Sequence, residues 1–119
     1  LGHSLEMAKA SGVQLVIDSG KVPKMDRVIE LIKEESVPGG AYSNMTHFDE
    51  WITFRESITM PEKIALFDPQ TSGGLLISVP AEKAERLLEE INRNQPDWAR
   101  IIGEVTSKDS KSQKYIKII

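Results

Sequence analysis

Hydrophobic residues recur along the first third of the chain at spacings that alternate between helical and extended. Over residues 3–11 the apolar positions follow the helical period, and Gly12 behind them is a common helix stop. Residues 13–18 form a compact apolar run rich in β-branched side chains, which favours a buried strand. After Pro23, apolar residues recur at i, i+3, i+4 and i+7 with charged residues between them. This pattern predicts an amphipathic helix that ends before the turn at 36–40.

The rest of the chain is predicted to continue this alternation. Residues 41–59 are the least regular, with a short helix expected over 46–51. Thr59 and Glu62 have the spacing of a capping box with an early proline, which predicts a helix over 60–66. The elements expected after it are a buried strand over 75–79, an amphipathic helix from Pro80 to about residue 91, and strands over 101–106 and 114–119. Four strands with interleaved helices predict an α/β or α+β sandwich around one mixed sheet.

Composition and charge place the chain among ordinary globular domains. Its 119 residues are the length of one domain, and hydrophobic and charged contents of 39% and 28% are typical. A net charge of −3 argues against non-specific binding to nucleic acid, which needs a basic surface. The absence of cysteine excludes a disulfide scaffold and a thiolate metal site, and fits a cytoplasmic protein. No apolar stretch approaches the ~20 residues of a membrane span, so no membrane partner is expected.

The first residues indicate that the chain is part of a longer protein. It opens with Leu1 rather than Met and enters a helical pattern at once. We therefore expect residues 1–119 to be a single domain of a longer protein, whose upstream residues carry much of the function.

The first candidate binding loop contains a pair of glycines. Gly39 and Gly40 follow Pro38, and Asn44 comes shortly after them. This arrangement is either a plain turn or a way to bring backbone and a side-chain amide to a ligand. The residues alone leave both interpretations open.

The second candidate loop runs from Asp68 to Gly74, with the sequence Asp-Pro-Gln-Thr-Ser-Gly-Gly, and leads into the apolar run at 75–79. Several backbone N–H groups and the hydroxyls of Thr71 and Ser72 gather here, as in an anion-binding nest. The alternative is a tight loop whose glycines allow close packing at the start of a strand. The carboxylate of Asp68 likewise either faces a ligand or accepts N–H groups of its own turn.

Other candidate chemistry is weaker. His3 and Glu6 have an i,i+3 spacing that can share a metal, but two ligands make no metal site, so a surface pair on the helix is the preferred interpretation. Trp51 and Phe54 are expected in the core or at a contact with another domain. No nucleophile elbow, phosphate-binding P-loop or dinucleotide-binding glycine motif is present. We therefore expect neither a catalytic residue nor a metal site in this chain.

The string from Asp68 to Leu76 resembles a hallmark motif of the selenophosphate synthetase (selenide, water dikinase) family. Three weaker features agree with it in family order: the opening Leu1-Gly2-His3 helix, Val37-Pro38-Gly39-Gly40 with Asn44, and Ile102-Gly103-Glu104-Val105. Together these features extend over the whole chain and correspond to the C-terminal half of that enzyme. The resemblance therefore implies the single C-terminal domain of a two-domain enzyme.

The resemblance also implies an activity. The family uses ATP, selenide and Mg²⁺ to make selenophosphate, AMP and orthophosphate. Within the wider aminoimidazole ribonucleotide synthetase-like superfamily, the C-terminal domain is a three-layer α/β/α structure around a mixed sheet of four or more strands. The full enzyme is expected to be a homodimer whose N-terminal domain holds ATP, most Mg²⁺ ligands and the reactive cysteine or selenocysteine. This chain alone is therefore expected to have no dikinase activity.

On this resemblance the two glycine-containing loops face the active-site cleft, and the chain closes that cleft over the N-terminal domain. The residues expected to contact phosphate or product are Gly39, Gly40, Asn44, Asp68, Gln70, Thr71, Ser72, Gly73 and Gly74.

Two alternatives to this function stay open. Another member of the superfamily, such as a thiamine-monophosphate kinase or the hydrogenase maturation protein, would share the C-terminal fold. The alternative of a different class is a stand-alone interaction domain that uses the region from Trp51 to Phe54 as its contact.

Overall fold

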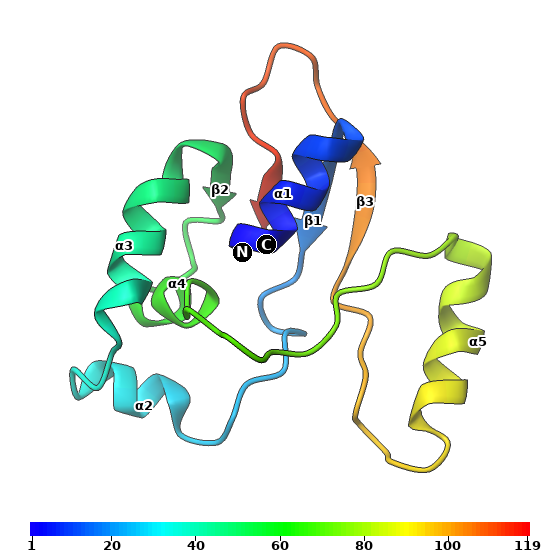
Figure 1. Cartoon of the computed structure of the whole chain (residues 1–119), viewed down its shortest axis with the longest axis horizontal. Coiled ribbons are helices and arrows are strands. Elements are labelled where there is room, and N and C mark those ends of the chain that lie inside the picture. The colour runs from blue at the N-terminus through cyan, green and yellow to red at the C-terminus, as the bar shows by residue number, and fades with distance from the viewer.

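A mixed four-stranded sheet forms the centre of the molecule (Figure 1). The computed structural model describes all residues 1–119. Its elements are α1 (Gly2–Ser11), β1 (Val13–Ile17), α2 (Val28–Lys33), α3 (Gly39–Phe48), the 3-10 helix η1 (Asp49–Trp51), β2 (Ile52–Phe54), α4 (Met60–Leu66), α5 (Ala81–Asn92), β3 (Gly103–Ser107) and β4 (Ile116–Ile118). The strand order is β2-β4-β1-β3, with β4 parallel to both of its neighbours and β3 antiparallel to β1. The predicted α/β class with a mixed sheet is confirmed.

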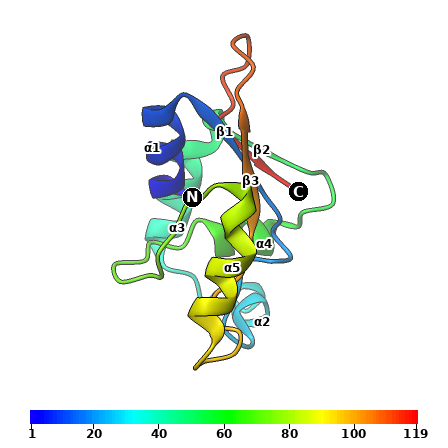
Figure 2. The same cartoon turned by 90° about the vertical axis from the view of Figure 1, so that its right-hand side faces the viewer.

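The sheet has one apolar face, and the core lies on it. Two rows of side chains cross β1, β4 and β2: Leu15, Ile116 and Ile52, then Ile17, Ile118 and Phe54. Because side chains alternate along a strand, the exposed Thr53 and Lys117 point to the opposite face. Helix α1 packs on β1 and β4 (Figure 2) and buries Leu5 and Ala8. The predicted helix over 3–11 and strand over 13–18 are thus confirmed as α1 and β1, at the centre of the fold.

Helix α4 leads the chain from the surface into this core. Glu62 and Thr59 form the predicted capping box, in which the Thr59 N–H donates to Glu62 Oε2 at 2.7 Å and the Thr59 hydroxyl donates to it at 2.6 Å. These hydrogen bonds stabilise the carboxylate and hold the pKa of Glu62 below its ordinary value of 4.5. At the other end, Phe67 is only 1% exposed and belongs to the core cluster. The buried side chain of Phe67 therefore fixes the position at which the backbone leaves the core and the Asp68–Gly74 loop begins.

Two helices differ from the sequence-based predictions. Helix α2 begins at Val28 rather than soon after Pro23, because Arg27 has a left-handed φ of 64° that interrupts helical backbone. Helix α3 begins at Gly39, inside the predicted turn, and together with η1 it replaces the short helix expected over 46–51. The sequence pattern does not predict β2, since a strand of three residues is too short to show alternation.

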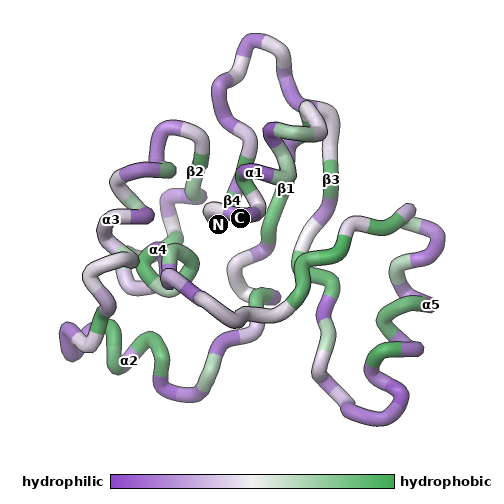
Figure 3. The backbone as a smooth tube through the Cα atoms, viewed as in Figure 1, coloured by the Kyte–Doolittle hydropathy of each residue, from purple (hydrophilic) through white to green (hydrophobic).

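Residues 75–79 do not form the predicted strand. They pair with no other strand, and Leu75 and Ile77 are 91% and 53% exposed. Figure 3 shows this apolar segment leading into α5. An apolar composition favours a strand only where a neighbouring strand supplies hydrogen bonds, and none does so here.

Helix α5 confirms its prediction but lies apart from the other helices. It stands beyond the edge strand β3, whereas α2, α3 and α4 gather at the β2 side of the sheet (Figure 1). None of its residues is fully buried, and Trp98 in the following loop is 74% exposed. None of the helices combines the length and the apolar character that a membrane span requires.

Candidate functional site

The two candidate loops meet at the end of α4. The side-chain amide of Asn44 donates a hydrogen bond from Nδ2 to the carbonyl oxygen of Phe67, at 3.0 Å. Four residues earlier in α3, Gly40 lies against Pro69: a Cβ placed on Gly40 would be 3.0 Å from Cγ and 3.2 Å from Cβ of the proline ring. The fold therefore brings together the two loops that the sequence motifs assign to one site.

The start of α3 presents backbone N–H groups beside this contact. Pro38 is the N-cap residue, has an extended backbone, and supplies no side-chain cap. The first N–H groups of a helix have no partner within it and carry the positive end of the helix dipole. Nothing lies within 4 Å of a Cβ placed on Gly39, so the backbone there is open to solvent. This end of α3 is suited to accept an anion, provided that other groups complete the site.

The second loop begins with a rigid turn. The N–H of Gln70 donates to the carbonyl oxygen of Asp68 at 2.9 Å, which closes a γ-turn around Pro69. The carboxylate of Asp68 makes no hydrogen bond or salt bridge within the chain. The backbone carbonyl rather than the side chain thus closes the turn, and the carboxylate is free to interact with other groups.

The glycines that follow do not form a nest. Neither Gly73 nor Gly74 has a positive φ, whereas a nest alternates right- and left-handed residues. The side chain of Gln70 folds over Gly73. A Cβ placed on Gly73 would be only 2.6 Å from Gln70 Oε1. All residues from 68 to 78 are exposed, and the hydroxyls of Thr71 and Ser72 make no hydrogen bond within the chain. The loop offers its polar groups to solvent from an extended backbone.

The charges around the loop do not complete a phosphate or metal site. No lysine or arginine occurs between Lys63 and Lys83, and Asp68 is the only carboxylate between Glu62 and Glu82. The chain contains no group of three or more His, Cys, Asp or Glu side chains that could hold a metal ion. The N–H and hydroxyl donors of the loop fit hydrogen bonding to an anion, whereas the side chains present do not fit a Mg²⁺ site.

The other side chains considered from the sequence have structural roles. His3 Nδ1 and Glu6 Oε2 are 3.1 Å apart on the exposed surface of α1, which confirms the interpretation as a surface pair. Trp51 lies under the ammonium group of Lys9, whose Nζ is 3.3 Å from the ring centroid. Phe54 packs against Phe67 with ring centroids 5.9 Å apart. Trp51 and Phe54 therefore pack against the core, as one of their two expected roles requires.

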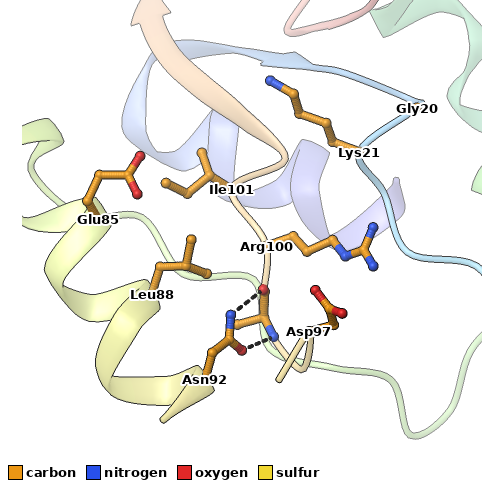
Figure 4. A pocket seen from close by; sticks show the side chains of 9 residues that line it. Gly20, Lys21, Glu85, Leu88, Asn92, Asp97, Arg100 and Ile101 are labelled. Atoms are coloured by element: carbon orange, nitrogen blue, oxygen red, sulfur yellow. Dashed lines mark hydrogen bonds between the residues drawn. The ribbon is translucent and has the colours of Figure 1, made fainter. Parts of the chain in front are cut away.

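A cavity of about 450 Å³ lies away from both loops, between α5, the loop after β1 and residues 97–101 (Figure 4). Its walls carry balanced charges, with Lys21 and Arg100 against Glu85 and Asp97. The Asn92 side chain closes one end with two hydrogen bonds to the backbone of the following loop, at 2.8 and 3.0 Å. No motif signals this cavity, because three separate segments form it. The balanced charges give it no preference for an anion.

Comparison with known proteins finds a family that matches nearly the whole chain. The model of the family "AIR synthase related protein, C-terminal domain" matches residues 1–115. The chain is 42% identical over 119 residues to a selenide, water dikinase of Clostridioides difficile, a match that covers 100% of this chain and 33% of that protein. It is 43% identical over 112 residues to selenide, water dikinase 2 of Peptoclostridium acidaminophilum, covering 94% and 32%. It is also 43% identical over 115 residues to a selenide, water dikinase of Treponema denticola, covering 93% and 32%.

The chain thus spans about one third of the length of these curated relatives. The family model, in contrast, covers nearly the whole chain, and the mixed sheet agrees with the fold that the motifs imply. The chain belongs to the family of AIR synthase related protein C-terminal domains.

Proposed function

We propose that this chain is the C-terminal domain of a selenide, water dikinase, which makes selenophosphate, AMP and orthophosphate from ATP, selenide and water. Relatives that carry this name are 42–43% identical to the chain. The observation that carries the proposal is the contact of Asn44 with Phe67 and of Gly40 with Pro69. This contact gathers the two family-like strings, which are distant in the sequence, at one place on the surface.

The proposed role of the chain is to close the active-site cleft with these two loops. The backbone N–H groups at Gly39 and along Thr71–Gly74, and the hydroxyls of Thr71 and Ser72, bind oxygens of phosphate or product. Because no cation lies near the loop in the sequence, the positive charge that phosphoryl transfer needs comes from elsewhere. We assign that charge and the Mg²⁺ to the N-terminal domain, since this chain has no ligand set for the ion.

The proposal extends to the whole protein. Its partners are ATP, selenide and the N-terminal domain, and it acts as a homodimer in the cytoplasm. A net charge of −3 and the lack of cysteine are compatible with these assignments, which leave no role for nucleic acid or a membrane.

The test is an assay of the full-length protein with ATP, Mg²⁺ and selenide under anaerobic conditions. We expect AMP by chromatography and selenophosphate by phosphorus NMR, and neither product from residues 1–119 alone. A full-length protein that forms no AMP would overturn the proposal. Phosphorylation of thiamine monophosphate instead would favour another enzyme of the superfamily.

The loop itself is tested by Gly73→Val in the full-length protein. A branched side chain at this exposed position displaces the Gln70 amide and blocks approach to the backbone, so kcat should fall about 100-fold while the protein stays folded. The matched control is Ser78→Val, which adds similar bulk at an exposed position outside the loop. Unchanged kinetics of Gly73→Val would remove the loop from the site.

A further inference from the structure

We infer that Asn44 and the contact between Gly40 and Pro69 form a latch that sets the position of the Asp68–Gly74 loop. This inference rests on the proposed function and deepens it, because it assigns a positioning role to Asn44 and Gly40. In this role they act on the reaction through the loop, and contact with phosphate is left to the loop and to the N–H groups of α3.

The first part of the latch fixes the point at which the loop leaves the core. The side chain of Phe67 is buried, and its N–H donates to the carbonyl oxygens of Lys63 and Ile64 at 3.2 and 3.0 Å. Its own carbonyl oxygen lies at the end of α4, where helical partners are lacking. Asn44 supplies the partner from α3 at 3.0 Å. The last peptide before the loop is therefore held from both sides.

The second part acts just beyond Asp68. The ring of Pro69 lies against the backbone of Gly40, where even one methyl group would press on it. The ring fixes the backbone of the proline, and the γ-turn from Asp68 to Gln70 extends this rigidity by one residue. Two contacts from α3 thus enclose Asp68, one before it and one after it.

No hydrogen bond anchors the remainder of the loop, residues 71–74. Residues 71–74 are exposed, and the side chain that lies against Gly73 is that of Gln70, which belongs to the loop itself. The latch therefore determines how far the loop lies from the N–H groups at the start of α3. A displacement of about 1 Å in groups that align a reacting phosphate can cost on the order of 100-fold in rate.

The first experiment changes Asn44 in the full-length protein. Asn44→Asp keeps the shape but replaces the N–H donor by a carboxylate facing a carbonyl oxygen, so kcat for AMP formation should fall about 10- to 100-fold with a smaller change in KM for ATP. Asn44→His offers a ring N–H at a similar distance from the backbone and should recover part of the rate.

The matched control for Asn44 is Thr46→Ala, since the Thr46 hydroxyl bonds only to the Tyr42 carbonyl oxygen within α3, at 3.0 Å. It should leave kcat unchanged. A merely structural role of Asn44 would lower the unfolding midpoint while kcat per folded molecule stayed constant, and that result would overturn the latch.

The second experiment changes the glycine contact. Gly40→Ala should reduce kcat, and Gly40→Ala with Pro69→Ala should recover part of it, because the nearest ring atom is removed. Combining Gly40→Ala with Asn44→Asp should give a loss smaller than the product of the single losses, since both act on one loop. Fully independent effects would overturn the shared latch.

A third measurement separates the latch from the proposed function. Hydrogen exchange at the N–H groups of Phe67 and Gln70, which are hydrogen-bonded on either side of Asp68, should be faster in Asn44→Asp and Gly40→Ala than in Thr46→Ala. Faster exchange supports the latch even if the unmodified protein makes no selenophosphate. Unchanged exchange overturns the latch even if that protein is an active dikinase.

Discussion

Two apolar runs of equal length, Val13–Ile17 and Leu75–Val79, differ in secondary structure and in burial. The first forms β1, which is paired on both sides and places Ile17 in the core at 6% exposed. The second is without a partner strand, and Ile77 is 53% exposed. Their compositions alone predict the same element, so the difference lies in what surrounds them.

The surroundings of the first run are supplied from both ends of the chain. Helix α1 precedes β1 directly and buries Leu5 and Ala8 against the sheet, while β3 and β4 come from the last fifth of the sequence. The second run lies between an exposed loop and α5, a helix with no buried residue. Strand formation here depends on partners and burial rather than on β propensity.

The sharpest test of this comparison makes one change in each run. Ile17→Ala should lower the free energy of unfolding by about 3 kcal/mol, because it removes buried methylene and methyl groups from the core. Ile77→Ala should change it by less than about 1 kcal/mol, since the side chain is half exposed. Urea unfolding of the same protein measures both values. Equal losses would show that residues 75–79 are packed as firmly as β1.

A smaller change in the free energy of unfolding is expected when alanine replaces two glycines, Gly103 and Gly74. A Cβ on Gly103 would overlap the Val16 carbonyl oxygen and lie 3.0 Å from Ile17 Cα, so Gly103→Ala should force β3 away from β1 at a cost of about 2 kcal/mol. A Cβ on Gly74 meets nothing within 4 Å, and Gly74→Ala should be neutral within about 0.5 kcal/mol. Thermal unfolding compares the two, and a tolerated Gly103→Ala would contradict the close pairing.

The smallest effect concerns pH. The hydrogen bonds from Thr59, first from its hydroxyl and then from its N–H, lower the pKa of Glu62, with weaker contributions from Lys24 and Lys33. Because the pKa of Glu62 is lower in the folded protein, the ionised side chain stabilises the fold at pH values above the ordinary pKa of 4.5. This stabilisation is lost as the pH falls through the lowered pKa of the folded state.

The matched variants for this effect are Glu62→Gln and Glu82→Gln, the second in the first turn of α5, where no side chain caps the helix. At pH 7, Glu62→Gln should cost less than about 1 kcal/mol, because the carboxylate is exposed and screened. Urea midpoints measured from pH 7 to pH 3 should show the cost shrinking with acidity. A constant difference across this range would argue against the capping interaction.

The elements that the sequence predicts correctly are those with local signals. The capping box at Thr59 and Glu62 identifies α4, and Gly12, with its left-handed φ of 65°, ends α1 where expected. The start of α3 at Gly39 is missed because paired glycines resemble a turn. Strand β2 is missed because its only support is parallel pairing with β4, which follows much later in the chain. Local rules carry no information about such partners.

For the candidate site, too, local motifs indicate some features and only the fold shows the others. The motifs identify Gly40 and Asn44 in one string and the residues from Asp68 in the other. Neither string indicates that Asn44 binds the Phe67 carbonyl, since the two residues are 23 positions apart and the contact depends on how α3 crosses α4. The sequence motifs thus nominate the candidate residues, while the contacts of Asn44 with Phe67 and of Gly40 with Pro69 come from the fold.

The two tryptophans lie in different surroundings, one beside the sheet and one after α5. Trp51 lies at the sheet, half-buried beneath the ammonium group of Lys9, whereas Trp98 follows α5 and is 74% exposed. An aqueous quencher such as iodide should therefore suppress the fluorescence of Trp98 and largely spare that of Trp51. The fluorescence of the two tryptophans therefore reports on the two regions separately. If the rest of the protein covers the α5 region, the emission of the quenchable Trp98 alone should shift to shorter wavelength.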